Sequence, residues 1–191
     1  MIIASKGLPD NYKSIDYIYA RGYIDTGIYP DADIRVEIAF LFKQIDSTQY
    51  LLGAGMTSWN DVFYIMINNK KQILLNIFDK PTIEYILKVN ERYIIKSYKN
   101  ELKLIDREGN IFSGLASHYA KQRNPNAIAI FNNRNKDGSV PNYFWSVCGV
   151  AYNKIYCGEK LIQHLVACER KSDGVVGMYD LVGRKFYTRS K

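Results

Sequence analysis

Apolar and polar residues alternate with a period of two along much of the chain. The clearest example is residues 34–42, where every second residue is Ile, Val or Phe and the positions between include Arg35 and Glu37. Successive side chains of a β-strand point to opposite faces, so this pattern predicts a strand with one face in a hydrophobic core. Similar short runs are separated by turn residues about every ten positions, which predicts roughly a dozen strands and an all-β sandwich or barrel.

Short polar turns join several of these runs into hairpins. Asn68-Asn69-Lys70-Lys71 separates two apolar runs, and Asn tolerates the positive φ that hairpin turns require. Asp106-Arg107-Glu108-Gly109 is a second turn signal of this kind. The expected hairpin strands are residues 62–67 with 72–78, 83–89 with 92–98, and 101–105 with 111–112.

Three other segments predict an interior strand, a short helix and a strand with a bulge. Residues 127–131 are apolar and predict an interior strand, whereas the pattern of residues 117–123 gives weak support to a short helix. Residues 145–157 alternate well, with a phase slip near Asn153 that predicts a β-bulge.

The domain organisation is expected to be simple. A length of 191 residues suits one domain, and no linker, repeat or low-complexity tract interrupts the chain. Residues 5–14 are polar and contain Gly and Pro, so we expect an N-terminal loop or extension over residues 1–14, followed by a single β-sandwich domain over residues 15–191.

The stretch from Leu161 to Tyr187 is the most informative in the chain. It predicts three short strands joined by tight turns at residues 171–174 and 180–183, where Asp and Gly supply the turn chemistry. An isolated hairpin is marginally stable in water, so these strands must close onto a sheet formed by earlier residues.

This stretch carries a resemblance to a known group of domains. The segment R-K-S-D-G-V-V-G-M-Y-D-L-V-G-R-K-F-Y-T at residues 170–188 resembles the closing motif of concanavalin A-like, laminin-G-like jelly-roll domains. Gly22-Tyr23-Ile24-Asp25-Thr26-Gly27-Ile28, followed by Pro30, resembles their opening motif. Such domains recur in surface proteins of gut bacteria and in tail or fibre proteins of their phages, usually as glycan-binding or adhesion modules.

The resemblance spans nearly the whole chain and implies a specific architecture. It implies a two-sheet antiparallel β-sandwich of the jelly-roll type, in which N- and C-terminal strands share a sheet. The strand at residues 23–28 would then lie close to the hairpin at residues 178–187. Asp25 and Asp180 belong to the two motifs, and we interpret both as structural residues that accept hydrogen bonds from turn N–H groups.

The composition of the chain favours strands and gives it a net positive charge. The chain has 16 Tyr and 8 Phe, and aromatic side chains fit a pleated, half-buried surface. Its net charge is +7, from 26 basic and 19 acidic residues. This charge is consistent with simple solubility or with attraction to an anionic partner such as teichoic acid, an acidic glycan or nucleic acid. The bases near residues 121–136 have only Tyr119 and Phe131 as nearby aromatics, and we expect Phe131 to be buried, which disfavours nucleic acid.

The cysteines and histidines disfavour a metal site. Cys148, Cys157 and Cys168 form no CxxC pair, and only His118 and His164 are available as imidazole ligands. We therefore expect buried free thiols in a protein made in a reducing cytoplasm, with no metal site and no disulfide framework.

No targeting or membrane-spanning segment is expected. The first residues lack the apolar core of a signal peptide, and no apolar run approaches the roughly 20 residues that span a bilayer. We expect a protein made in the cytoplasm that acts in a virion or outside the cell after lysis, without membrane insertion.

The resemblance raises an enzymatic alternative, because sandwiches of this type also carry glycosidases. Retaining enzymes need two carboxyl groups about 5–5.5 Å apart, and laminarinase-like members carry Glu-x-Asp-x-Glu on one strand. This chain has no such triplet, since Glu37 has Arg35 and Ala39 beside it on its face. It also lacks GxSxG, P-loop, HExxH and GxGxxG motifs. We expect no catalytic residues, unless two carboxylates converge from different strands.

Two loops combine aromatic rings with polar groups, as sugar sites do. Sugars present apolar C–H faces and hydroxyl rims, which aromatic rings and Asn, Asp or Arg side chains recognise. Loops on a rigid sandwich are common places for binding residues, although these residues also serve turns and cores. The candidate ligand-binding residues are Trp59, Asn60, Asp61, Asn133, Arg134, Asn135, Asp137, Tyr143 and Trp145.

Calcium is a weaker expectation. Laminin-G-like domains sometimes bind calcium at the rim, and Asp61, Asn135 and Asp137 could supply oxygens. Calcium requires six to eight oxygen ligands, and the chain lacks a dense Asp cluster, so we expect no cofactor.

The sequence thus predicts a non-enzymatic module for glycan binding or adhesion, and the resemblance suggests a phage tail, fibre or capsid-decorating protein. Its partner would be a cell-surface glycan or another virion protein. The alternative is a purely structural virion protein that uses the lectin fold for protein–protein contacts, with homo-oligomers as one form.

Overall fold

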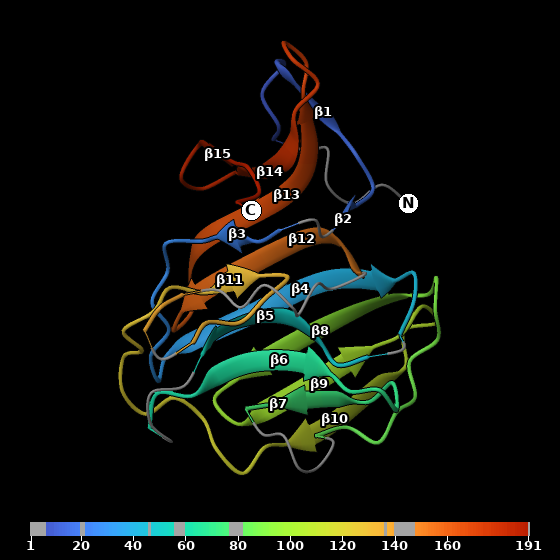
Figure 1. Ribbon diagram of the computed structural model, residues 1–191, viewed down its shortest axis with the longest axis vertical. Coiled ribbons are helices and arrows are strands. Elements are labelled where there is room, and N and C mark those ends of the chain that lie inside the picture. The colour runs from blue at the N-terminus through green and yellow to red at the C-terminus, as the bar shows by residue number, and fades with distance from the viewer. Residues whose placement is uncertain are drawn as a thin grey trace.

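The fold is a sandwich of two antiparallel β-sheets (Figure 1). The computed structural model describes residues 7–19, 22–45, 47–55, 60–76, 82–135, 137–139 and 148–190. No helix occurs in these ranges, so none there is long and apolar enough to span a membrane. The expected all-β, two-sheet antiparallel sandwich is confirmed.

The larger sheet contains ten strands in the described residues. Eight of them follow the order β10-β9-β8-β4-β12-β13-β14-β15, while β1 pairs with β13 and β2 with β12. The strands are β1 (Tyr12–Ser14), β2 (Ile18–Tyr19), β4 (Ile34–Phe42), β8 (Arg92–Tyr98), β9 (Glu101–Ile105), β10 (Ile111–Leu115), β12 (Cys148–Cys157), β13 (Lys160–Arg170), β14 (Val176–Asp180) and β15 (Lys185–Tyr187).

The smaller sheet has the order β3-β11-β5-β6-β7 and lies in front of the larger one in Figure 1. Its strands are β3 (Ile24–Asp25), β5 (Gln49–Gly55), β6 (Phe63–Ile67), β7 (Ile73–Leu75) and β11 (Ala129–Ile130).

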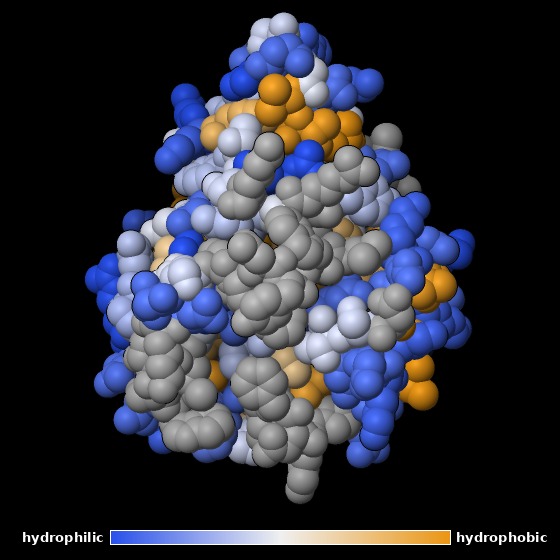
Figure 2. Space-filling model, in the orientation of Figure 1, coloured by the Kyte–Doolittle hydropathy of each residue, from blue (hydrophilic) through white to orange (hydrophobic). Residues whose placement is uncertain are grey.

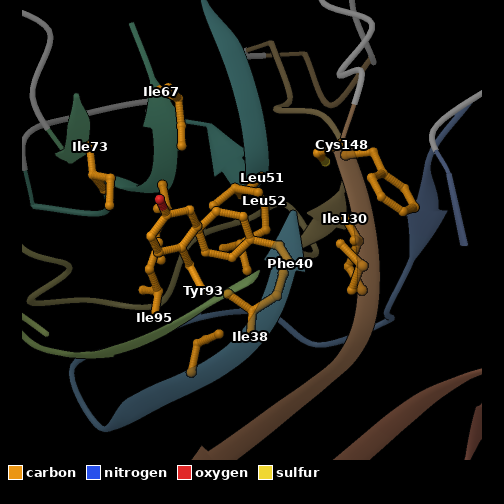
Figure 3. Packing of buried hydrophobic residues seen from close by; sticks show 14 of the residues in the cluster. Ile38, Phe40, Leu51, Leu52, Ile67, Ile73, Tyr93, Ile95, Ile130 and Cys148 are labelled. Carbon is orange, nitrogen blue, oxygen red and sulfur yellow. The ribbon is translucent and has the colours of Figure 1, made fainter. Parts of the chain in front are cut away.

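The core lies between the two sheets, and β4 supplies its central row. The five apolar residues at alternate positions of β4 are buried, as the period-two pattern predicts. Phe40 and Tyr93 lie side by side there, with ring centroids 5.9 Å apart (Figure 3). Leu51 and Leu52 of β5 contribute from the smaller sheet. Residues at the other positions of β4, including Arg35 and Glu37, therefore point to the outer face of the larger sheet.

A bulge in β12 changes which of its residues face the core. Val150 pairs with Phe40, but Tyr152 pairs with Ala39, so Ala151 is the extra residue. Before the bulge Val150 is in the core, and after it Ile155 is in the core while Tyr152 is packed on the outer face. The sequence predicted this phase slip near Asn153, two positions further along the chain.

The chain ends lie close together as expected, but β3 belongs to the smaller sheet, whereas β14 and β15 belong to the larger one. The N-terminal strands β1 and β2 join the C-terminal strands in the larger sheet. Tyr23 N donates to Ser190 O (3.1 Å) and Ser190 N donates to Tyr23 O (2.8 Å), which ties β3 to the end of the chain after β15. The outermost part of the larger sheet, with β1, β13 and β14, extends beyond the smaller sheet (Figure 1). Figure 2 shows apolar atoms gathered on this extension.

Some sequence predictions differ from the structure because distant backbone groups compete. Residues 12–14, expected in a loop, form β1 against β13. Residues 83–89 make only one bridge, Ile83 with Ile73, and form no strand. Residues 117–123 form no helix, because Lys121 N and Gln122 N donate to Asn60 O at 2.6 and 3.0 Å.

The three cysteines are free thiols. Cys148 and Cys168 are buried as expected, and burial raises the pKa of Cys168 to about 11. Cys157, at the end of β12, is exposed, so the expectation of burial is wrong for this residue. It is the last residue of β12, directly before the turn at residues 158–159, where the strand leaves the core.

Gly114 in β10 gives a direct test of this packing. A Cβ at this position would lie 1.7 Å from the backbone oxygen of Thr82. We expect Gly114→Ala to lower the free energy of unfolding by about 1–3 kcal/mol, because the two backbones must separate. The neighbouring exposed substitution Ser113→Ala should change it by less than about 0.5 kcal/mol. Urea denaturation measures both, and equal stability of the two variants would contradict the packing.

Candidate functional site

The structure brings the two predicted loops together at one end of the sandwich. Asn124 Nδ2 donates to Gly55 O at 3.2 Å and to Asp61 O at 2.6 Å. A Cβ on Gly55, the last residue of β5, would lie 2.3 Å from Arg134 O, so the second loop packs against the end of β5 that precedes the first loop. Three of the predicted ligand-binding residues, Trp59, Tyr143 and Trp145, lie outside the described residues.

Arg134 holds this loop cluster in place. Its guanidinium donates to Ala127 O (2.7 Å), Gly138 O (3.0 Å) and Asp25 Oδ2 (2.5 Å). The Arg134 side chain is largely buried. Its donors therefore join the 127–138 segment to β3.

The other predicted loop residues also contact neighbouring parts of the protein. Asp61 is buried, and the Asn60 carbonyl accepts the two hydrogen bonds that prevent the predicted helix. Asn133 hydrogen-bonds to the phenol of Tyr50. Asn135 Nδ2 and Asp137 Oδ1 both bond to Ser139, at 2.9 and 2.6 Å. Hydrogen bonds from Ser139 hold the pKa of Asp137 below its ordinary value. The binding role of these residues stays a prediction.

The two aspartates of the opening and closing motifs have the expected structural role. Asp180 Oδ1 accepts hydrogen bonds from His164 N and Val182 N, each at 3.0 Å. Asp25 Oδ1 accepts one from Gly27 N at 2.9 Å. Both carboxylates therefore satisfy backbone donors at turns or between neighbouring strands.

A second candidate site lies on the outer face of the larger sheet. It is a hollow of about 230 Å³ across β4, β8, β9 and β12, which we call the outer hollow. It lies in the middle of the sheet's strand order, near the ends of β8 and β12 that precede the turns at residues 99–100 and 158–159. The residues that line it are Arg35, Val36, Glu37, Lys96, Ser97, Tyr98, Glu101, Lys103 and Tyr156.

The first row of the outer hollow is an arginine between two tyrosines. Arg35 on β4 pairs with Tyr98 on β8 and with Tyr156 on β12. The guanidinium carbon lies 5.6 Å from the centroid of the Tyr98 ring and 5.5 Å from that of Tyr156. Arg35 Nη1 also donates to Glu159 Oε1 at 2.6 Å, and the Glu159 side chain is 94% exposed. The rings therefore position the cation more than its exposed acidic partner does.

The second row is a glutamate between two lysines. Glu37 on β4 pairs with Lys96 on β8 and Lys154 on β12. Their ammonium groups lie 3.1 and 3.0 Å from its carboxylate oxygens, and Tyr152 OH donates to it at 2.8 Å. Opposite charges therefore face one another across three strands.

These contacts determine the protonation of Glu37. Burial raises its pKa, but hydrogen bonds from Lys154, Tyr152 and Lys96 outweigh burial, so the pKa lies below the ordinary value. Burial and the hydrogen bond to Glu37 raise the pKa of Tyr152. At neutral pH Glu37 is therefore a carboxylate and Tyr152 a neutral donor. In this state the Glu37 carboxylate can position neighbouring groups through its charge, but it has no proton to donate.

The outer hollow contains a second carboxylate, Glu101, on β9. Convergence of two carboxylates from different strands was the one arrangement that kept the glycosidase alternative open. The lowered pKa of Glu37 disfavours it as a general acid. Among the described residues, no group of three or more His, Cys, Asp or Glu side chains is placed to hold a metal ion.

The sequence identified Glu37 and Arg35 as neighbours on one face of a strand, but missed the rest of the outer hollow. Their partners on β8 and β12 lie about 60 and about 120 positions further along the chain, and only the strand register aligns them. The alternation within residues 92–98 and 152–156 was the available signal. Comparison with models of known protein families finds no match, and a search of curated proteins also finds none.

Glu37 should make stability depend on pH. Because its folded pKa is lowered below 4.5, the unfolded chain binds the proton first. The stabilisation of the folded state by the Glu37 carboxylate is therefore complete above pH 4.5, and it is lost as the pH falls through the pKa of Glu37 in the folded state. We expect Glu37→Gln to lower the free energy of unfolding by about 1–3 kcal/mol at neutral pH, with a smaller difference at about pH 3.

Urea denaturation at the two pH values measures this effect. Glu159→Gln, which removes an exposed carboxylate next to the outer hollow, is the matched control and should change stability by less than about 1 kcal/mol. A Glu37→Gln effect that is equally large at both pH values would contradict the assignment.

Proposed function

We propose that the protein is a non-enzymatic carbohydrate-binding or adhesion module of the concanavalin A-like jelly-roll type. The observation that carries this proposal is the row Tyr98–Arg35–Tyr156 in the outer hollow. Aromatic rings pack against the apolar C–H faces of sugars, and guanidinium, carboxylate and hydroxyl groups bond to the hydroxyl rims. The outer hollow supplies both kinds of group on rigid strands.

Two further observations support this proposal. The sequence at both ends of the chain resembles concanavalin A-like, laminin-G-like domains, and the two-sheet antiparallel sandwich is compatible with that group. From the same resemblance we propose a phage tail, fibre or capsid-decorating protein that binds a cell-surface glycan.

A glycan panel tests the proposal and the position of the site. We expect binding to at least one oligosaccharide, with Tyr98→Ala and Tyr156→Ala each weakening it by about tenfold through loss of ring contact. Tyr29→Ala is the matched control, since Tyr29 is an exposed tyrosine with Arg123 over its ring at 5.1 Å. Binding that is unchanged by the two tyrosine variants but lost in Trp59→Ala or Trp145→Ala would place the site at the loop cluster. A folded protein that binds no sugar in the panel would contradict the proposal.

The edge strand β10 favours a second candidate, a structural module for protein–protein contacts. Its sequence is Ile-Phe-Ser-Gly-Leu, and Ile111 and Leu115 are 62% and 69% exposed on the same face. No described strand pairs with its other edge. Edge strands usually carry charges, Pro or bulges that block further pairing, and β10 has neither a charge nor a proline.

This second candidate predicts self-association through β10. Leu115→Lys should then weaken the association measured by sedimentation equilibrium by about tenfold or more, because a charge is placed in an apolar contact. Val182→Lys, at an exposed apolar position outside β10, should leave it unchanged. A wild-type protein that stays monomeric at all concentrations would contradict self-association through this edge.

A further inference from the structure

We propose that the ligand of the outer hollow is an acidic saccharide, whose negatively charged group is bound by Arg35. This inference rests on the proposed carbohydrate-binding function and specifies its ligand class. It depends on the available donors of Arg35, the charge around the outer hollow and the position of the two rings.

The guanidinium of Arg35 is held in place by its neighbours and keeps N–H donors available for a ligand. The rings of Tyr98 and Tyr156 flank its guanidinium, whereas Glu159 bonds to Nη1 alone in the described structure. A planar guanidinium binds a carboxylate, sulfate or phosphate through two parallel hydrogen bonds. Because an exposed ion pair contributes little, an anionic ligand can displace the Glu159 carboxylate at small cost.

The charges around Arg35 favour an anion. Three cations and two carboxylates line the outer hollow. Lys96 and Lys154 together more than neutralise Glu37. Lys99 adds a further cation, with its ammonium 5.1 Å from the centroid of the Tyr98 ring. A surface of net positive charge attracts negatively charged ligands and raises their association rate.

The Tyr98–Arg35–Tyr156 row offers an acidic saccharide more contacts than it offers a simple anion. Strands lie about 4.8 Å apart, so a ring and the guanidinium are near neighbours on the surface. A sugar can therefore pack its C–H face on Tyr98 or Tyr156 while its acidic group reaches Arg35. A free inorganic anion would contact Arg35 but not the rings.

Calorimetric titration with matched probes tests the inference. The probes are tetragalacturonate, its neutral methyl ester and a sulfated tetrasaccharide, which distinguish a carboxylate from a sulfate requirement. We expect at least one acidic probe to bind about tenfold or more tightly than the ester. Arg35→Gln should weaken that binding by about 10- to 100-fold, as expected for loss of charge-assisted hydrogen bonds.

Arg170→Gln is the matched control. Arg170 resembles Arg35 in exposure, in its surface ion pair with Asp173 and in lying 5.2 Å from the centroid of an aromatic ring, that of Phe186. It lies at the other end of β13, roughly 30 Å from the turn beside the outer hollow. Its variant has the same loss of net charge, so it should bind the acidic probe within about twofold of wild type.

The outcomes separate this inference from the proposed function. Equal binding of the acidic probes and the ester, or binding of neutral sugars alone, would overturn the acidic-saccharide inference and leave carbohydrate binding intact. Equal losses in Arg35→Gln and Arg170→Gln would also overturn it, because they would indicate non-specific charge attraction. Absence of binding to every sugar of the panel would overturn both. Circular dichroism verifies that each variant is folded.

Discussion

The burial of one face of β4 is the constraint on which the rest of the structure depends. Its alternate apolar residues fill the centre of the core, while its two edges pair with β8 and β12. A slip of one residue in either pairing would turn a whole set of side chains to the wrong face. Because the core determines the register, it also determines which residues stand beside Arg35 and Glu37 on the outer face. The core thus positions the outer hollow.

The bulge at Ala151 completes this arrangement. Val150 and Ile155 both face the core although they are five positions apart, which a regular strand does not allow. The extra residue turns Tyr152, Lys154 and Tyr156 outward, and these side chains supply one partner of Arg35 and two of Glu37. Bulges often redirect side chains near functional sites. Here a single inserted residue brings the β12 side of both rows to the surface.

Local patterns predicted the elements that the chain encodes locally. The alternation of residues 34–42 and the turn residues at 68–71 and 106–109 predicted β4 and two hairpins, which are confirmed. Residues 117–123 were mispredicted because the distant carbonyl of Asn60 accepts hydrogen bonds from two of their N–H groups. The outer hollow was missed for a similar reason, since β8 and β12 are far from β4 in sequence. The loop residues Asn135 and Asp137 met the composition of a sugar site, but the same groups bond to Ser139.

The closing motif at residues 170–188 is connected to the outer hollow through a chain of contacts. Asp180 accepts the backbone N–H of His164 on the neighbouring strand. The His164 ring packs edge-on against Tyr152, with centroids 6.1 Å apart, and Tyr152 donates to Glu37. Burial lowers the pKa of His164, so at neutral pH this contact adds no charge beside Lys154. A motif that aligns two terminal strands is thereby linked to Tyr152, one of the three donors that keep Glu37 ionised. The residues of the proposed ligand site lie on β4, β8 and β12, outside this motif.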